Sequence, residues 1–149
     1  MSTSSTVAVC LWFDGQAEEA ARFYTSLIPN SKITGTSPVM VTFTLDGVPF
    51  QALNGGPQFK PTEAASICVR TADQAETDRL WGALTADGGR EGRCAWLKDR
   101  FGVSWQIVPS VLPNMLGSSD RDAAGRALEA MMRMTKIEIA LLESAYAGK

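Results

Sequence analysis

Two glutamines lie at the same place in two copies of a short pattern, and their amides could bind a ligand. The pattern is Gly-Val, a variable residue, an aromatic residue and glutamine, and its copies end at Gln51 and Gln106. A side-chain amide both donates and accepts hydrogen bonds, so two glutamines that face one cavity suit a neutral polar ligand. The alternative is that both amides are bonded within the core, to the backbone or to each other.

Cysteines are the candidate nucleophiles, because the chain contains no histidine. Without an imidazole base, the Ser-His-Asp and Cys-His arrangements are excluded, as are zinc-protease motifs and the two-histidine iron site. Cys10 and Cys68 occupy matching positions in the two halves and are candidate catalytic residues; the alternative is Glu63 or Asp99 at the cavity mouth as a base. The alternative is that both cysteines are small buried hydrophobic residues of equivalent strands.

The two halves match over more than the glutamine pattern, which indicates that one folding unit is repeated. Three further segments recur in the same order: residues 9–11 as 67–69, 16–18 as 74–76, and 22–27 as 79–84. Apolar runs, helical spacings and turn residues predict the order strand, helix, strand, strand, strand in each half. We therefore expect an α+β fold in one domain over 1–149, with modules at 7–56 and 64–110 and a linker at 57–63.

Residues 120–147 are expected to form one long C-terminal helix after a loop at 113–119. Ser119 is the expected N-cap, with Asp122 in capping-box spacing. Apolar residues recur at helical intervals along this segment: Ala127, Met131, Met134, Leu141 and Ala145. Such a stripe either covers the duplicated core or packs on a second chain, and on this basis we expect a homodimer.

Composition restricts the other partners. The formal net charge is -2 and no basic run occurs, so nucleic acid is not an expected partner. No stretch is long and apolar enough to span a membrane, and residues 1–6 show no secretory signal. Three cysteines without such a signal indicate reduced thiols, and hence a cytoplasmic protein.

Several segments together resemble the PhnB-like branch of the vicinal oxygen chelate superfamily, which includes glyoxalases, bleomycin-resistance proteins and extradiol dioxygenases. The segments are residues 11–24, 50–57, 96–109 (W-L-K-D-R-F-G-V-S-W-Q-I-V-P) and 131–146, so the similarity extends over nearly the whole chain. This branch is often labelled demethylubiquinone 3-methyltransferase-like. The resemblance implies a glyoxalase-like fold, in which the two modules form a half-open barrel.

The resemblance also implies where a metal would be held. Relatives use four side chains, which fall here at Gln51, Gln106, Ser66 and near Val7 or Ala8. Two amides, a hydroxyl and an aliphatic side chain are poor ligands, so we expect no metal, no cofactor, and neither glyoxalase nor dioxygenase chemistry. The methyltransferase label finds little support either, because the glycines of segment 54–57 follow a fourth strand and precede no helix.

Strand alternation adds the remaining candidates, since it places Leu53 and Val108 beside the glutamines and turns Phe50 and Trp105 toward the helices. The candidate ligand-binding residues are Trp12, Gln51, Leu53, Ser66, Arg70, Trp96 and Gln106. Apolar walls with a few polar groups are typical of small-molecule pockets. The leading hypothesis is a metal-free small-molecule binding protein. The alternatives are a metal-independent enzyme and a dimeric structural module with a filled barrel.

Overall fold

The computed structural model describes residues 5–149 as two compact units, which divide between Pro61 and Thr62. The prediction of no secretory signal concerns residues 1–6, of which residues 1–4 lie outside the described part.

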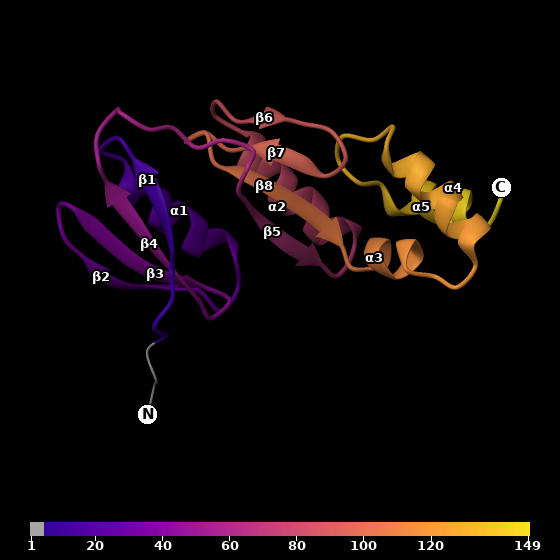
Figure 1. The fold of residues 1–149 in the computed structure, drawn as a ribbon, viewed down its shortest axis with the longest axis horizontal. Helices are drawn as coiled ribbons and strands as arrows, with labels where there is room; N and C mark the ends of the chain where they lie inside the picture. The colour runs from indigo at the N-terminus through magenta and orange to yellow at the C-terminus, as the bar shows by residue number, and fades with distance from the viewer. Residues whose placement is uncertain (1–4) are drawn as a thin grey trace. The chain divides into compact units, whose positions relative to one another are not determined.

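The first unit is one helix packed on a four-stranded mixed sheet, sheet A (Figure 1). Its elements are β1 (Val9–Phe13), α1 (Ala17–Leu27), β2 (Lys32–Thr36), β3 (Met40–Leu45) and β4 (Val48–Asn54). The strand order is β1-β4-β3-β2, with β1 parallel to β4 and the other pairs antiparallel. The small residues of α1, among them Ala17, Ala20 and Ala21, are fully buried and let the helix lie close to β3 and β4.

The second unit repeats this arrangement as sheet B. Its elements are β5 (Ser66–Thr71), α2 (Gln74–Thr85), β6 (Arg90–Glu91), β7 (Trp96–Lys98) and β8 (Ser104–Pro109). The strand order is β5-β8-β7-β6, again with one parallel pair, β5 with β8. Leu80, Trp81 and Leu84 of α2 are buried, and α2 packs on β7 and β8. The two equal topologies confirm the predicted duplication and the α+β fold class.

The prediction of one C-terminal helix over 120–147 is wrong, and the loop predicted at 113–119 is helical as far as Leu116. Three helices follow sheet B: α3 (Val111–Leu116), α4 (Arg121–Met131) and α5 (Ile139–Tyr146). Asp120, one residue after the expected Ser119, caps α4 by accepting a hydrogen bond from the Ala123 amide at 3.1 Å. None of the helices within 5–149 is long and apolar enough to cross a bilayer.

Tertiary hydrogen bonds account for the break between α4 and α5. The carbonyl oxygens of Met134 and Thr135 accept from the amides of Cys94 and Ala95, at 2.9 and 3.0 Å. These carbonyls therefore bind the loop before β7 instead of continuing a helix. Ile137, which follows them, is fully buried and anchors the connecting segment.

The predicted apolar stripe is largely used inside the chain. Ala127 and Met134 belong to a buried cluster with residues of α3, α5 and the connecting segment, and Met131 packs against it. The stripe thus covers part of the chain's own core, which was one of its two expected roles. Leu141 and Ala145 lie outside this cluster, and 54% of the Leu141 surface is exposed. The homodimer stays a prediction. Most of the stripe no longer supports it, because these residues pack within the chain.

Candidate ligand-binding faces of the two sheets

Each sheet has one face covered by its helix and a second face, which we call its open face. Phe50 and Trp105 are buried on the helix faces, whereas Gln51 and Gln106 are only partly buried on the opposite side. This alternation follows the period of two along a β-strand and agrees with the prediction. The glutamines therefore lie on the open faces, outside the apolar cores.

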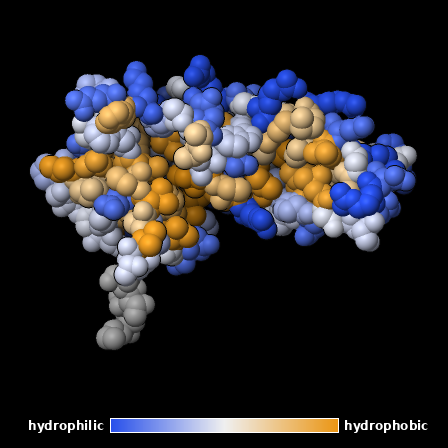
Figure 2. Space-filling model, in the orientation of Figure 1, coloured by the Kyte–Doolittle hydropathy of each residue, from blue (hydrophilic) through white to orange (hydrophobic). Residues whose placement is uncertain are grey.

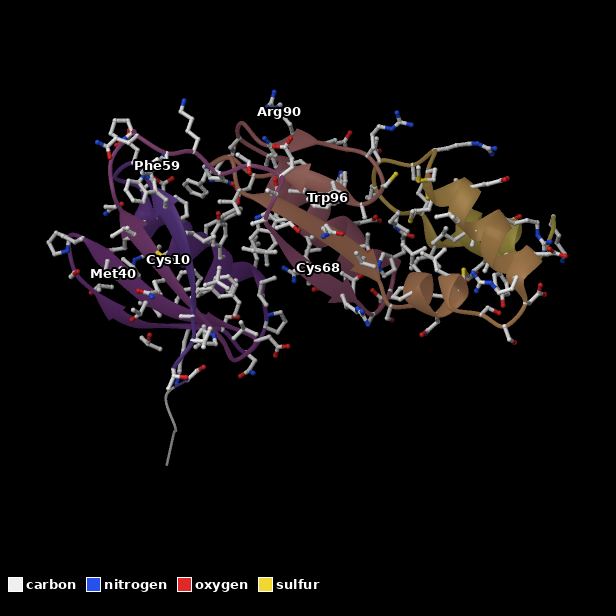
Figure 3. All side chains as sticks on the ribbon, in the orientation of Figure 1. Cys10, Met40, Phe59, Cys68, Arg90 and Trp96 are labelled. Atoms are coloured by element: carbon white, nitrogen blue, oxygen red, sulfur yellow. The ribbon has the colours of Figure 1, made fainter. Side chains whose placement is uncertain are left out.

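A cysteine beside a glutamine forms the centre of both open faces. Cys10 on β1 pairs with Gln51 on β4, and Cys68 on β5 pairs with Gln106 on β8. Both thiols are exposed, so the alternative that they are small buried hydrophobic residues is wrong. They lie on the strands of the two sheets in Figure 3. Neither thiol has a base as hydrogen-bond partner among residues 5–149.

Next to this centre, the open face of sheet A has an apolar row. Trp12, Leu53 and Met40 lie next to one another on β1, β4 and β3. The Trp12 indole donates to the Gly56 carbonyl at 2.8 Å and meets the Phe59 ring edge-on, with the ring centroids 5.0 Å apart. In the space-filling view, hydrophobic residues gather over the strands of this unit (Figure 2). The linker segment after β4 thus holds Trp12 in place.

Around the same centre, sheet B is polar. Ser66, Ser104 and Lys98 lie side by side on β5, β8 and β7. The Gln106 amide donates to the Ser66 hydroxyl at 2.9 Å, and the Lys98 ammonium pairs with the Glu63 carboxylate at 2.6 Å. The Ser104 hydroxyl is buried and has no hydrogen-bond partner. We call Ser66, Ser104 and Lys98 the first row of sheet B.

Asp99, expected as a base at a cavity mouth, is a structural carboxylate. Only 2% of it is exposed, and its oxygens accept from the amides of Phe101 and Val103 and from the Trp105 indole, at 2.8, 3.1 and 2.8 Å. The turn after β7 is therefore built around a buried carboxylate. The sequence contained a signal for it, since Asp at the first and Gly at the fourth position favour a type I turn, as in Asp99 to Gly102.

Glu63, the other expected base, is also poorly suited to that role. The hydrogen bond from Lys98, together with the charge of its ammonium group, holds the pKa of the Glu63 carboxyl below its ordinary value. A general base that works near neutral pH needs a carboxyl whose pKa is raised. Glu63 instead carries a fixed negative charge beside the first row of sheet B.

The side chains at the expected metal positions do not fit a metal ion. Gln51 and Gln106 offer amides, and the Ser66 hydroxyl already accepts a hydrogen bond from Gln106. No group of three or more His, Cys, Asp or Glu side chains that could hold a metal occurs among residues 5–149. Divalent cations prefer several anionic or imidazole ligands, and this donor set supplies none.

The predicted ligand-binding residues divide between the two sheets. Sheet A carries Trp12, Gln51 and Leu53, and sheet B carries Ser66, Arg70, Trp96 and Gln106. Arg70 pairs with Val108 and Trp96 with Gln106, so all four residues of sheet B lie on one face. The prediction missed Ser104 and Lys98. Alternation could have found Ser104, because it precedes Gln106 by two residues on the same strand.

Comparison with known proteins places this fold in a family. The sequence model described as 3-demethylubiquinone-9 3-methyltransferase matches residues 5–108. A solved PhnB protein from Bacillus cereus, described as a 3-demethylubiquinone-9 3-methyltransferase, is 29% identical with a TM-score of 0.64. That match covers 71% of this chain and 100% of the Bacillus chain. No curated protein matches the sequence.

More distant structures share the fold. A protein from Bacillus cereus described as a possible glyoxalase is 13% identical with a TM-score of 0.50, and the match covers 70% of this chain and 99% of that one. The fosfomycin resistance protein FosX from Listeria monocytogenes, solved with Mn(II) and sulfate, is 14% identical with a TM-score of 0.56. Here the match covers 77% of this chain and 97% of FosX. At this level of identity the likeness concerns the glyoxalase-like fold alone.

Proposed function

This chain belongs to the PhnB-like 3-demethylubiquinone-9 3-methyltransferase family with its glyoxalase-like fold, and from that premise we propose that it binds a small molecule without a metal. The open faces of the two sheets supply the binding groups. The glutamines Gln51 and Gln106 are the central hydrogen-bonding residues, and the surrounding side chains select the ligand.

The observation that carries this proposal is the state of the Gln51 amide. Gln51 is half-buried on the open face of sheet A, between Cys10 on β1 and Thr42 on β3. No hydrogen bond of its side chain is recorded in the described part of the chain. A glutamine with a purely structural role would bond its amide within the core, whereas the Gln51 amide is left to solvent, which a ligand can displace. An amide that both donates and accepts is instead available to a ligand.

The family name supplies a second hypothesis, methyl transfer, which the residues support less well. Binding of a nucleoside cofactor in α/β methyltransferases uses a Gly-rich loop between a first strand and a helix. The Gly55-Gly56 segment follows β4, leads into no helix and is occupied by Trp12, whose indole bonds to Gly56. This segment therefore does not fit such a cofactor.

A metal-independent enzyme and a dimeric structural module remain alternative proposals. Exposure of Cys10 and Cys68 favours the enzyme, since an accessible thiol can act as a nucleophile. A thiol of that kind normally has a neighbouring base. The pairing of each cysteine with a neutral glutamine favours binding over catalysis.

Isosteric variants test the binding proposal. Wild-type protein is screened by thermal shift and ligand-observed NMR against neutral polar small molecules, and each hit is repeated with Gln51→Met and Gln106→Met. Loss of one buried hydrogen bond is expected to weaken binding by about tenfold, with the melting temperature of the free protein nearly unchanged. Gln58→Met in the linker is the matched control and leaves binding as it was.

Two results would contradict the proposal. The first is hit binding that survives unaltered in both glutamine variants, because the amides would then not contact the ligand. The second is a stoichiometric transition metal in the purified protein, measured by mass spectrometry of the elements. Labelling of one thiol by a substrate analogue would favour the enzyme instead.

A further inference from the structure

The first row of sheet B has the composition of an anion site. Ser66, Ser104 and Lys98 belong to three neighbouring strands, and Ser104 is paired in register with both of the others. Side chains directly opposite each other on neighbouring strands lie close together on one face. Two hydroxyl donors and one ammonium group therefore line up within a single row.

Ser104 is the unusual member of this row. Its side chain is 1% exposed, yet its hydroxyl has no hydrogen-bond partner. Burial of an unpaired hydroxyl costs free energy, so a serine here weakens the fold unless something else uses it. An alanine would fill the same place without that cost. A ligand oxygen that accepts from the hydroxyl would give Ser104 a reason to be there.

A carboxylate already lies on the ammonium group of this row. Glu63 precedes β5, and its carboxylate meets the Lys98 ammonium at 2.6 Å. The Glu63 side chain is 68% exposed, whereas that of Lys98 is 29% exposed. An ion pair with such an exposed partner is weak and is readily exchanged for a competing anion. The Glu63 carboxylate thus shows that the Lys98 ammonium group can bind a carboxylate at this place.

We propose that the first row of sheet B is a carboxylate subsite, at which the carboxylate of a small monocarboxylic acid replaces Glu63 on Lys98 and accepts from the Ser104 hydroxyl. This proposal rests on the proposed binding function and names the class of its ligand. One ammonium group and two neutral hydroxyls match a single negative charge better than the double charge of phosphate. The Gln106 amide, bonded to Ser66, lies in the next row and reaches the rest of the same ligand.

Sheet A has no counterpart of this subsite. At the places of Ser104 and Lys98 it carries Pro49 and Thr44, which pair with each other in register. Neither is charged, and proline has no side-chain donor. The carboxylate therefore binds to sheet B, because sheet A offers amide, threonine hydroxyl and apolar contacts but no cation at these places.

Titration of labelled protein with acetate tests the subsite. Amide chemical shifts are followed with sodium acetate at pH 7 and constant ionic strength, and separate titrations use inorganic phosphate and sodium chloride. Saturable shifts on β5, β7 and β8 are expected with acetate. Lys98→Gln abolishes them, and Ser104→Ala weakens binding by about tenfold, as for one hydrogen bond to a charged group. Glu63→Gln tightens acetate binding, because the internal competitor is removed.

Thermal unfolding gives a readout that a structural role would not produce. Ser104→Ala keeps or raises the melting temperature while weakening acetate binding. The matched control pair is Lys136 and Asp78, an ion pair of 2.8 Å with similar exposure. Lys136→Gln and Asp78→Asn leave acetate binding unchanged.

Three outcomes would overturn the carboxylate subsite. One is equal acetate binding by wild type and Lys98→Gln, and another is weaker acetate binding in Glu63→Gln. The third is phosphate binding tighter than acetate, which would assign the row to a dianion. If acetate fails but neutral ligands still bind in a Gln106-dependent way, the subsite is wrong and the proposed function stands. If acetate binds and no Gln106-dependent ligand is found, the subsite stands and the proposed function is wrong.

Discussion

The open faces of sheets A and B have the same cysteine–glutamine pair at their centres but carry different side chains at most of the surrounding positions. On each open face a cysteine of the first strand pairs with a glutamine of the fourth. The neighbours in sheet A are an indole, a leucine and a methionine, whereas those in sheet B include two serines and a lysine. The helix faces must keep the register of the strands because they bury the core. The open faces are free of that requirement, so two copies of one unit can offer a ligand different chemistry.

The hairpin turns after the third strands show the same divergence. In the first unit, Asp46 lies in an exposed turn with a positive φ of 48° and accepts one exposed hydrogen bond from Asn30 at 3.3 Å. In the second, the buried Asp99 accepts three hydrogen bonds, one of them from Trp105. An equivalent turn has become part of the core in only one unit.

The largest effect is therefore expected at Asp99. Asp99→Ala leaves the Trp105 indole and two turn amides without their acceptor, which should lower the free energy of unfolding by about 3 kcal/mol. Chemical denaturation followed by tryptophan fluorescence measures the loss. Asp46→Ala, the matched change in the first unit, should cost about 0.5 kcal/mol or less. Equal costs for the two variants would mean that the turns do not differ.

An intermediate effect is expected at Gly55. The backbone amides of Gly55 and Ser110 make equivalent bonds, to Phe13 and Thr71 at 2.9 Å in both cases. A Cβ at Gly55 would overlap the Trp12 ring. Gly55→Ala should lower the free energy of unfolding by about 2 kcal/mol, since the added methyl group displaces the Trp12 ring.

The control for Gly55 comes from the second unit, where Arg70 takes the place of Trp12. Ser110→Ala removes no recorded side-chain hydrogen bond and should change stability by less than about 0.5 kcal/mol. The two variants are compared by thermal unfolding and by the tryptophan emission spectrum, in which a change at Trp12 appears as a difference from the wild-type spectrum. An unshifted spectrum in Gly55→Ala would contradict the contact.

The smallest of these effects is expected at the repeated glutamine that precedes or opens each helix. Gln74 joins α2 to the segment before α5, because its amide donates to the Ile137 carbonyl at 3.0 Å and accepts from the Ile139 amide at 2.7 Å. Gln16 is the N-cap of α1 but makes no side-chain capping bond. Gln74→Ala should therefore lower the free energy of unfolding by about 1 kcal/mol, and Gln16→Ala should leave it almost unchanged.

Hydrogen exchange can locate the effect of Gln74→Ala. The amides of α4 and α5 should exchange faster in this variant, whereas those of sheet A keep their protection. Faster exchange in sheet A alone would show that Gln74 does not hold the C-terminal helices.

Much of the fold could be predicted because it depends on local patterns. Period-two alternation identified the strands, and the repeated segments identified the duplication. Asp73 caps α2 with its own side chain, by accepting from the Glu76 amide at 2.9 Å, and such a cap lies next to its helix in the sequence. The C-terminal region resisted prediction because backbone bonds to Cys94 and Ala95, distant in the sequence, end the helix that its apolar spacing favoured.

The candidate site was predictable only in outline. Alternation placed Gln51 and Gln106 on faces away from the helices, and composition excluded histidine chemistry. Whether an acidic residue serves the fold or the site depends on partners that sequence spacing does not reveal. Asp99 accepts a hydrogen bond from the buried Trp105 indole, and Glu63 forms an ion pair with Lys98.

The sequence by itself determined the duplicated units, the side of each strand that faces its helix, and the lack of imidazole chemistry, because these follow from residue types and their local period. The tertiary structure alone decided which polar groups are used up in packing. The amide of Ala17 at the start of α1, for example, is satisfied by the Asn54 side chain at 2.9 Å, from the far end of the sheet strand β4. Hydrogen-bond partners of this kind are set by the packing of distant segments, and among residues 5–149 they leave the buried Ser104 hydroxyl without a structural partner.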